Sequence, residues 1–285
     1  MVKSATTYDA QIAKIRAHGC IVEDETACRE ILANVNYYRL SAYFLPFMTI
    51  EKQYKTGTEF ATVYKTYEFD RKMRQVLFSA MEEVEVFLRA QLSYFHGHKY
   101  GSLGYLDTSN FNNRHNHDRF LKELDREIDR NRTVLFVNHH INKYNRAFPI
   151  WVAVELFSFG ALSRFYIDLP LSDQKALARD LFHTVPKNVA SWLRCCTDLR
   201  NLCAHYGRLY YRIFGAIPAG LSGIDLYAER RLFATVLALR ALFPDAAKWN
   251  AQFLHALTSL LDAYEGAIDL AHIGFPEDWE TKLRK

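Results

Sequence analysis

The residues of this sequence that are best suited to chemistry lie in the segment SWLRCCTDLRNLCAHYGRLYYRIF, residues 191–214. If this segment is one helix, with about 100° between successive residues, its side chains divide into two faces. One face is a polar stripe of an amide, a histidine and three arginines: Asn201, His205, Arg194, Arg208 and Arg212. The opposite face is apolar and is formed by Trp192, Leu199, Leu202, Tyr206, Leu209 and Ile213. Arg200 lies on the flank of the stripe, and its long side chain can reach toward it.

Arginines gathered around one histidine suit a phosphodiester substrate. The planar guanidinium group donates paired hydrogen bonds to phosphate oxygens and favours the charge that develops there during cleavage. Histidine can exchange a proton with a sugar oxygen near neutral pH. In RNA the neighbouring 2′-hydroxyl can be the nucleophile, so neither a protein nucleophile nor a metal is required. The spacing alone leaves a second interpretation open, and on its own favours it: a solvated basic helix face with an incidental histidine.

The elements that must position these residues are predicted to be helical. Apolar residues recur at every third or fourth position over 59–95 with no glycine or proline, which predicts one long amphipathic helix that Gly97, Gly101 and Gly104 end. Strand signals are few and no internal repeat is found, so the predicted fold class is all-α. Further helices are predicted at 6–18, 24–34, 117–130, 149–167, 172–182, 186–214, 226–242 and 246–267.

The composition limits the class of protein. Among 285 residues, 49% are apolar, which permits a substantial core, whereas the net charge of +4 does not by itself guarantee a broad nucleic-acid surface. No apolar stretch approaches the roughly 20 residues of a membrane span, and the first residues lack the apolar run of a signal peptide. The five cysteines include no CxxC pair, which favours free thiols in a reducing compartment. We therefore expect a soluble, cytoplasmic protein that does not contact membranes.

A family resemblance adds to this interpretation. The hexapeptide RNLCAH, residues 200–205, resembles the R-x4-H signature of HEPN ribonucleases. Four longer blocks resemble, in the same order, those of the AbiD/AbiF abortive-infection family. They are NYYRLSAYFLPF at 36–47, FDRKMRQVLFSAMEEVEVFLRA at 69–90, FPIWVAVELFSFGALSRFY at 148–166 and SWLRCCTDLRNLCAHYGRLYYR at 191–212. The resemblance covers the chain from about residue 30 to about residue 212.

The resemblance implies an antiphage role, with RNA as target or partner, and a HEPN-type helical bundle. We expect an N-terminal helical elaboration over 1–55, a HEPN-like domain with C-terminal helical additions over 56–275, and a polar tail over 276–285. Arg200 and His205 would be the catalytic pair of a metal-independent endoribonuclease, and Asn201 would orient them. The cations expected to contact RNA are Arg194, Arg208, Arg212 and Arg39. One departure is minor: family members often have N-R after R-L-[WY], where this chain has Arg208-Leu209-Tyr210-Tyr211-Arg212.

The motif occurs once in the chain. HEPN ribonucleases generally build one active site from two such motifs that face each other across a twofold axis. The resemblance therefore implies a homodimer with a composite site. The alternative is a second, degenerate site within the same chain. A regulatory RNA or an antitoxin is a further candidate partner.

Two other groups of residues are candidates for supporting roles. Glu82, Glu85 and Arg89 share one face of the predicted long helix, where a carboxylate could orient Arg200 or His205. An exposed ladder of ion pairs is the alternative. Arg39 lies in a tyrosine-rich stretch that could contact RNA by stacking and phosphate binding, although packing of N-terminal helices against the core is the more common role of such a stretch.

No metal or cofactor is expected. The pairs His96 and His98, His115 and His117, and His139 and His140 have no cysteine or carboxylate at ligand spacing. The cysteines of 191–214 are expected to be buried thiols, and Tyr206 is expected on the apolar face. Two other functions stay open: a non-cleaving RNA-binding regulator of the same defence system, and a protein-interacting defence adaptor.

Overall fold

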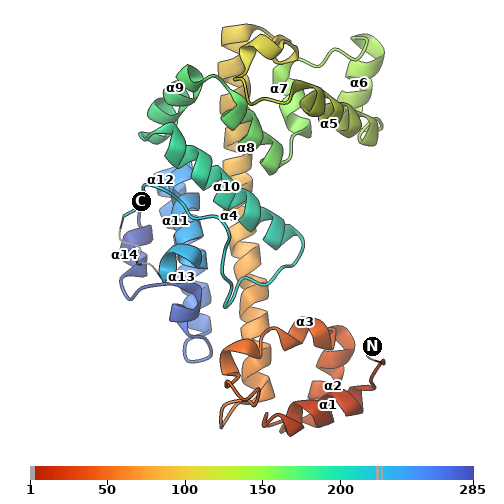
Figure 1. Cartoon of the computed structure of the whole chain (residues 1–285), viewed down its shortest axis with the longest axis vertical. Helices are drawn as coiled ribbons and strands as arrows, with labels where there is room; N and C mark the ends of the chain where they lie inside the picture. Colours follow the sequence, from red (N-terminus) through yellow and green to blue (C-terminus); the bar gives the residue numbers. More distant parts are fainter. Residues whose placement is uncertain (1–3, 223–224, 226) are drawn as a thin grey trace.

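The computed structural model describes residues 4–222, 225 and 227–285, and this part of the chain is all-α, as the sequence predicts. Two isolated β-bridges, Ile21 with Glu59 and Met48 with Tyr54, are the β contacts of the described residues. Figure 1 shows one long helix, α4, with helical groups at both of its ends and beside its middle. No described helix is both long and apolar enough to cross a membrane.

Helix α4 spans Phe60–Tyr100 and is about 60 Å long at 1.5 Å per residue. It continues past the predicted end at residue 95, because Gly97 does not break it. A Cβ atom on Gly97 would lie only 3.2 Å from the Ile150 side chain, so this glycine allows a neighbouring helix to approach closely. Gly101, with φ of +83°, is the residue that ends the helix.

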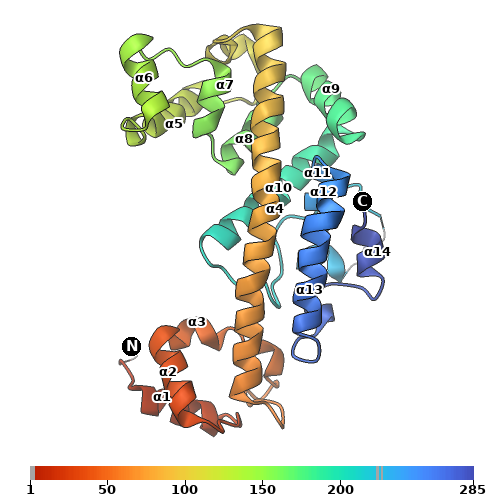
Figure 2. The ribbon, with the colours of Figure 1, turned by 180° about the vertical axis from the view of Figure 1, so that it is seen from behind.

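Three short helices pack together at the N-terminal end of α4 (Figures 1 and 2). They are α1 (Tyr8–Ala17), α2 (Glu25–Asn34) and α3 (Tyr37–Ser41). The side chains of Thr7 and Asp24 cap the first two helices by accepting a hydrogen bond from the backbone N–H three residues later. We call residues 8–47, which form α1 to α3 and the following 3₁₀ turn, the N-terminal unit.

Four helices gather at the other end of α4: α5 (His117–Arg130), α6 (Leu135–Lys143), α7 (Ile150–Ala153) and α8 (Phe159–Asp168). The helix predicted over 149–167, for which Gly160 was the candidate break, is divided earlier, before Phe159. A 3₁₀ turn at Val154–Leu156 follows α7, and Ser158 starts a new helix by accepting a hydrogen bond from the Ala161 N–H.

Helix α9 (Leu171–Phe182) leads into α10 (Pro186–Ala204), which crosses α4 and packs on α4, α8 and α11. The C-terminal elements are α11 (Leu232–Leu242), α12 (Ala246–Lys248), a π-helical segment at Trp249–Leu254, α13 (His255–Ala263) and α14 (Trp279–Leu283). The predicted helix at 226–242 is shorter in the structure, and residue 226 lies outside the described residues. Within 276–285, Leu283 is fully buried and its carbonyl accepts a 2.7 Å hydrogen bond from the Trp249 indole.

Candidate active site

Helix α10 ends inside the R-x4-H segment. Its last residue is Ala204, and His205 is the C-cap, with φ of −100° and ψ of 17°. Tyr206 then adopts a left-handed conformation, with φ of +57°, and the Gly207 N–H donates to the Leu202 carbonyl at 2.7 Å. The single helix predicted over 186–214 is therefore wrong after residue 204. The exposed side chain of His205 stands at the end of the helix rather than on its flank.

A buried carboxylate on α4 explains why the chain turns here. Asp70 is fully buried and accepts hydrogen bonds from the backbone N–H groups of Leu209 and Tyr210, at 3.1 and 2.7 Å. It also accepts from the Tyr43 hydroxyl at 2.7 Å and forms an ion pair with Arg74 at 2.5 Å. Backbone groups that donate to this carboxylate cannot continue the hydrogen-bond pattern of α10.

The Asp70 cluster, formed by Asp70, Arg74 and Tyr43, was not anticipated as part of the site. Burial raises the pKa of Asp70, while Arg74 and the donated hydrogen bonds act in the opposite direction. Arg74 is also nearly buried and donates from Nη1 to the Gly207 carbonyl at 3.1 Å. The available signal was an acidic and a basic residue four positions apart on the apolar face of the predicted long helix.

The end of α10 changes the predicted polar stripe. Arg194 and Asn201 are exposed on α10, as its helical projection requires. Arg208, in contrast, does not lie on the predicted polar stripe. It is half-buried, its Nη1 donates to the Ala42 carbonyl at 2.9 Å, and burial lowers its pKa. Arg212 is half-buried and lines a shallow concavity with Asn201 and His205.

The apolar face predicted beyond residue 204 is also wrong in part. Tyr206 is 68% exposed and Ile213 is 62% exposed, whereas Leu209 is buried as expected. A straight helical projection cannot place these residues, because the backbone reverses direction at Tyr206 and Gly207. Tyr206 is consequently available to a ligand rather than to the core.

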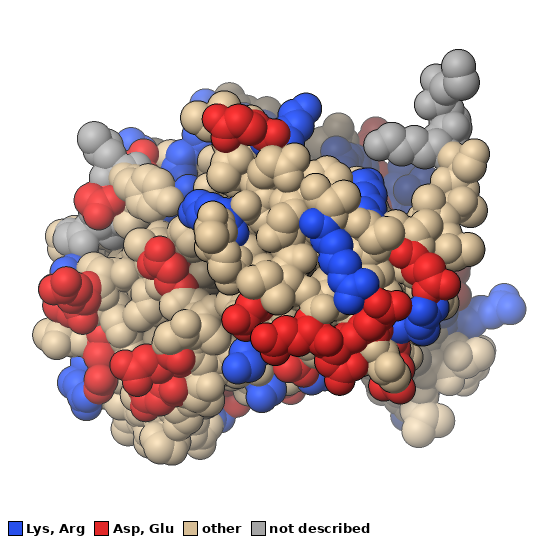
Figure 3. Space-filling view, turned by 90° about the horizontal axis from the view of Figure 1, so that it is seen from below, with Lys and Arg blue, Asp and Glu red and all other residues tan. Residues whose placement is uncertain are grey.

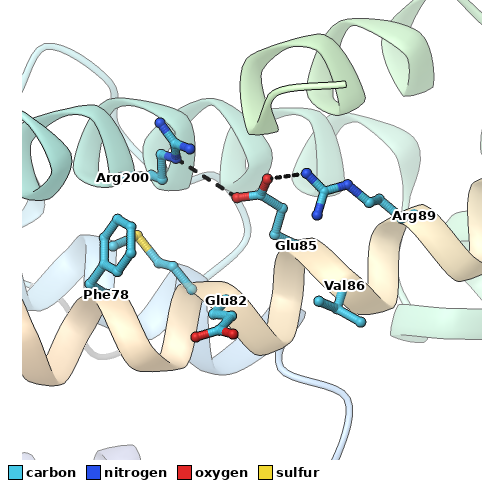
Figure 4. Close-up of a pocket in the computed structure, with 7 residues that line it drawn as sticks. Phe78, Glu82, Glu85, Val86, Arg89 and Arg200 are labelled. Carbon is cyan, nitrogen blue, oxygen red and sulfur yellow. Dashed lines mark hydrogen bonds and ion pairs between the residues drawn. The ribbon is translucent and has the colours of Figure 1, made fainter. Parts of the chain in front are cut away.

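Arg200 projects from α10 toward α4, where it meets a carboxylate (Figure 4). Its Nε lies 3.8 Å from Oε2 of Glu85, and the other oxygen of Glu85 accepts from Nη2 of Arg89 at 2.6 Å. Arg89 is fixed in turn, because it donates to the carbonyls of Val154 and Phe157 at 3.2 and 2.9 Å. One carboxylate therefore faces two guanidinium groups.

The pocket around Arg200 is small, about 180 Å³, and Glu82 lines it together with Glu85. Glu82 is exposed, whereas the Glu85 side chain is only 13% exposed. The Nε of Arg200 is buried and has no hydrogen-bond partner among the described residues. The two carboxylates of the pocket balance the charges of Arg89 and Arg200, and the Arg200 guanidinium keeps an unused donor with which it could bind an anion.

Arg200 and His205 open onto different concavities of one chain. Arg200 faces α4, whereas His205 lines the shallow concavity with Asp198, Asn201 and Arg212. The two side chains therefore do not converge on a common pocket within a single copy.

Arg39 of α3 contacts the turn after His205. Its Nη1 donates to the Tyr206 carbonyl at 2.6 Å, while the rest of the side chain stays exposed. Together with the Arg208–Ala42 and Tyr43–Asp70 hydrogen bonds, this contact connects the N-terminal unit to the turn that carries His205. The position of His205 thus depends on residues about 165 positions earlier in the sequence.

The described residues contain no group of three or more His, Cys, Asp or Glu side chains that could hold a metal ion. His115 and His117 are instead hydrogen-bonded to each other at 3.2 Å, and Nδ1 of His115 contacts Asp168 at 2.9 Å. All five cysteines are buried and free. Burial raises the pKa of Cys203, on α10, to about 12, so this thiol is protonated at neutral pH.

A protein-family model described as Abi-like protein matches residues 30–211. The match runs from the second half of α2 through α10 and the turn that follows, and it includes the Asp70 cluster, Arg200 and His205. No curated protein and no solved structure matches the chain.

Proposed function

The chain belongs to the Abi-like protein family, and from this premise we propose that it is a metal-independent endoribonuclease of the HEPN type that uses Arg200 and His205. Membership of this family suggests a role in abortive-infection defence. The observation that carries the proposal is the pairing of a partly buried, carboxylate-held Arg200 with an exposed His205 at the end of the same helix. One group suits phosphate binding and the other suits proton transfer.

The proposed reaction is an attack of the RNA 2′-hydroxyl on the adjacent phosphorus. A histidine takes the proton from the 2′-oxygen as the O2′–P bond forms, and a histidine gives a proton to the 5′-oxygen as the P–O5′ bond breaks. Arg200 donates hydrogen bonds to the phosphate oxygens, whose charge grows in the transition state. The products are a 2′,3′-cyclic phosphate and a 5′-hydroxyl.

A homodimer is part of this proposal. Two histidines serve the two proton transfers most simply, and each chain supplies one motif. The separation of Arg200 and His205 into different concavities supports it, because a second copy could supply the group that each concavity lacks. Sedimentation velocity of the purified protein should give the mass of two chains, and a monomer that cleaves RNA at full rate would contradict this part.

The direct test is cleavage of total RNA by purified protein in EDTA, with the ends of the products identified. His205→Ala and Arg200→Ala should each abolish cleavage, whereas His255→Ala, which removes an exposed histidine of α13, should retain it. Full cleavage by His205→Ala would contradict the assigned mechanism. Loss of cleavage by wild type on addition of EDTA would contradict its independence of metal.

One observation favours a second candidate function, a regulator that binds RNA without cutting it. Within a single chain, Arg200 and His205 do not share a pocket, so a protein that acts as a monomer could use these side chains only for binding. This candidate predicts that the double variant Arg200→Ala, His205→Ala keeps its protective effect against phage. The endoribonuclease proposal predicts that the double variant loses it.

A further inference from the structure

A large groove lies beside the motif, between the N-terminal unit and the end of α10. Figures 1 and 2 show α3 and the end of α10 on the same side of α4. The groove has a volume of about 1000 Å³, at the upper end of the range of about 300–1,000 Å³ that is typical of ligand pockets. One wall is formed by α2 and α3, the second by α4, and the third by the end of α10 with Tyr206.

The groove is cationic. Three arginines line it, Arg39, Arg71 and Arg74, against a single carboxylate, that of Glu82. Arg74 is neutralised by Asp70, but Arg39 and Arg71 are exposed and form no ion pair with a carboxylate of the described residues. The contact of Arg39 with a backbone carbonyl leaves its charge in place. An occupant of this groove should therefore carry negative charge.

Aromatic rings also line the groove. Tyr206 is 68% exposed and Phe78 is 41% exposed, so each presents a ring surface that the protein leaves uncovered. Tyr67 is fixed more firmly, because it packs edge-on to Tyr43 at 5.3 Å and stacks on Tyr64 at 5.8 Å between ring centroids. Exposed aromatic rings among unpaired arginines are the combination with which proteins bind the bases and the phosphates of single-stranded nucleic acid.

The groove is continuous with the pocket of Arg200. Phe78 and Glu82 line both, one turn apart on α4. Its third wall is formed by Cys203, Ala204 and Tyr206, the chain neighbours of His205, whereas the His205 side chain lines the separate shallow concavity. A strand that fills the groove therefore extends toward Arg200.

We propose that this groove binds a single-stranded segment of RNA next to the phosphate that is cut, with Arg39 and Arg71 on its backbone and Tyr206 and Phe78 on its bases. This inference rests on the proposed function. It adds that the RNA substrate is single-stranded and that it lies along this groove. A broad contact with duplex RNA fits less well. On the face seen from below in Figure 3, acidic side chains gather in patches and the basic side chains are scattered among them, so this face offers no continuous basic surface to a duplex.

The test measures binding of a fluorescein-labelled single-stranded RNA of about 12 nucleotides by fluorescence anisotropy. The protein carries His205→Ala, so that the probe is not cut. Arg71→Gln should weaken binding and lower the salt slope of log K by about 0.7, the value for one lost phosphate contact on a single strand. The matched control is Lys72→Gln, because Lys72 is the next residue but its Nζ lies 5.1 Å from the Tyr264 ring, outside the groove.

The stacking part of the proposal is tested with Tyr206→Asn, because asparagine tolerates the left-handed backbone at this position. Affinity should fall about 5- to 150-fold, the range expected for loss of one stacked base. Tyr94→Asn removes an exposed tyrosine that lies on α4, outside the groove, and should leave affinity unchanged.

Two failures are distinguishable. If the parent protein binds no RNA, the proposed function itself is wrong. If it binds RNA but Arg71→Gln and Tyr206→Asn bind as tightly as their controls, the groove is not the path of the RNA, and the proposed function survives. A duplex of the same sequence that competes as well as the single strand would also overturn the assignment.

Discussion

Replacing Asp70 with asparagine should destabilise the protein and disable the motif together. The side chain keeps its size, but the nearly buried Arg74 loses its counter-charge, and the new amide brings an N–H group toward donors that need an acceptor. Removing one partner of a buried ion pair costs about 3–5 kcal/mol. This is a large share of the roughly 5–15 kcal/mol by which domains are stable.

Urea unfolding followed by tryptophan fluorescence gives this free energy, and the chain has four tryptophans. Asp180→Asn is the control, because Asp180 forms an ion pair with its neighbour Arg179 on the surface. Loss of this ion pair should leave the unfolding midpoint unchanged. The double variant Asp70→Asn, Arg74→Met should be less destabilised than the sum of the two single variants, since no buried charge is left alone. An Asp70→Asn protein within 1 kcal/mol of wild type would refute this account of the cluster.

Three further predictions concern Glu85, His96 and Gly207. Glu85→Gln should lower the kcat of RNA cleavage by about 100-fold with KM little changed, because Arg200 loses the carboxylate that positions it. If Arg89→Ala lowers kcat and the unfolding temperature as much as Glu85→Gln does, the role of Glu85 is purely structural. Burial lowers the pKa of His96 from 6.5 to about 4. As the pH falls, the His96 side chain is therefore protonated in the unfolded chain before it is protonated in the folded protein. Stability should therefore fall by about 2 kcal/mol between pH 7 and pH 5, and His96→Phe should remove that loss in urea titrations at the two pH values. Gly207→Ala should reduce cleavage and stability, because a Cβ atom there would displace the Leu202 side chain, 2.6 Å away, and crowd the Leu202 carbonyl, 3.3 Å away; unchanged melting and activity would contradict it.

Periodicity predicted the all-α fold and the long central helix, because both depend on a local pattern of apolar residues. It also predicted that Glu85 shares a helix face with Arg89, and the structure places Glu85 beside Arg200. It did not predict the end of α10. The sequence from Arg200 to Ile213 continues a helical pattern, and only a carboxylate far away in the chain, Asp70, takes the hydrogen bonds that would have extended the helix.

The positions of Arg39 and Arg208 could not be predicted for the same reason. Both are surface-type residues with no local partner, and both bind backbone carbonyls about 165 residues away. Tyr206 was expected on the apolar face because the projection assumed a continuous helix. The glycine that follows it was the local signal against that assumption.

The contacts between the N-terminal unit and the turn at 206–210 also set the order in which the site can form during synthesis. About 165 residues of chain separate Arg39 from its acceptor, the carbonyl of Tyr206. The Asp70 cluster needs the backbone N–H groups of Leu209 and Tyr210. A growing chain that has not reached residue 210 holds the buried carboxylate but not the groups that satisfy it. The turn that carries His205 is thus among the last parts of the site to be organised, since contacts so distant in sequence close late. For a protein proposed to cut RNA, the cutting site can therefore form only after the ribosome has passed the codon of Tyr210.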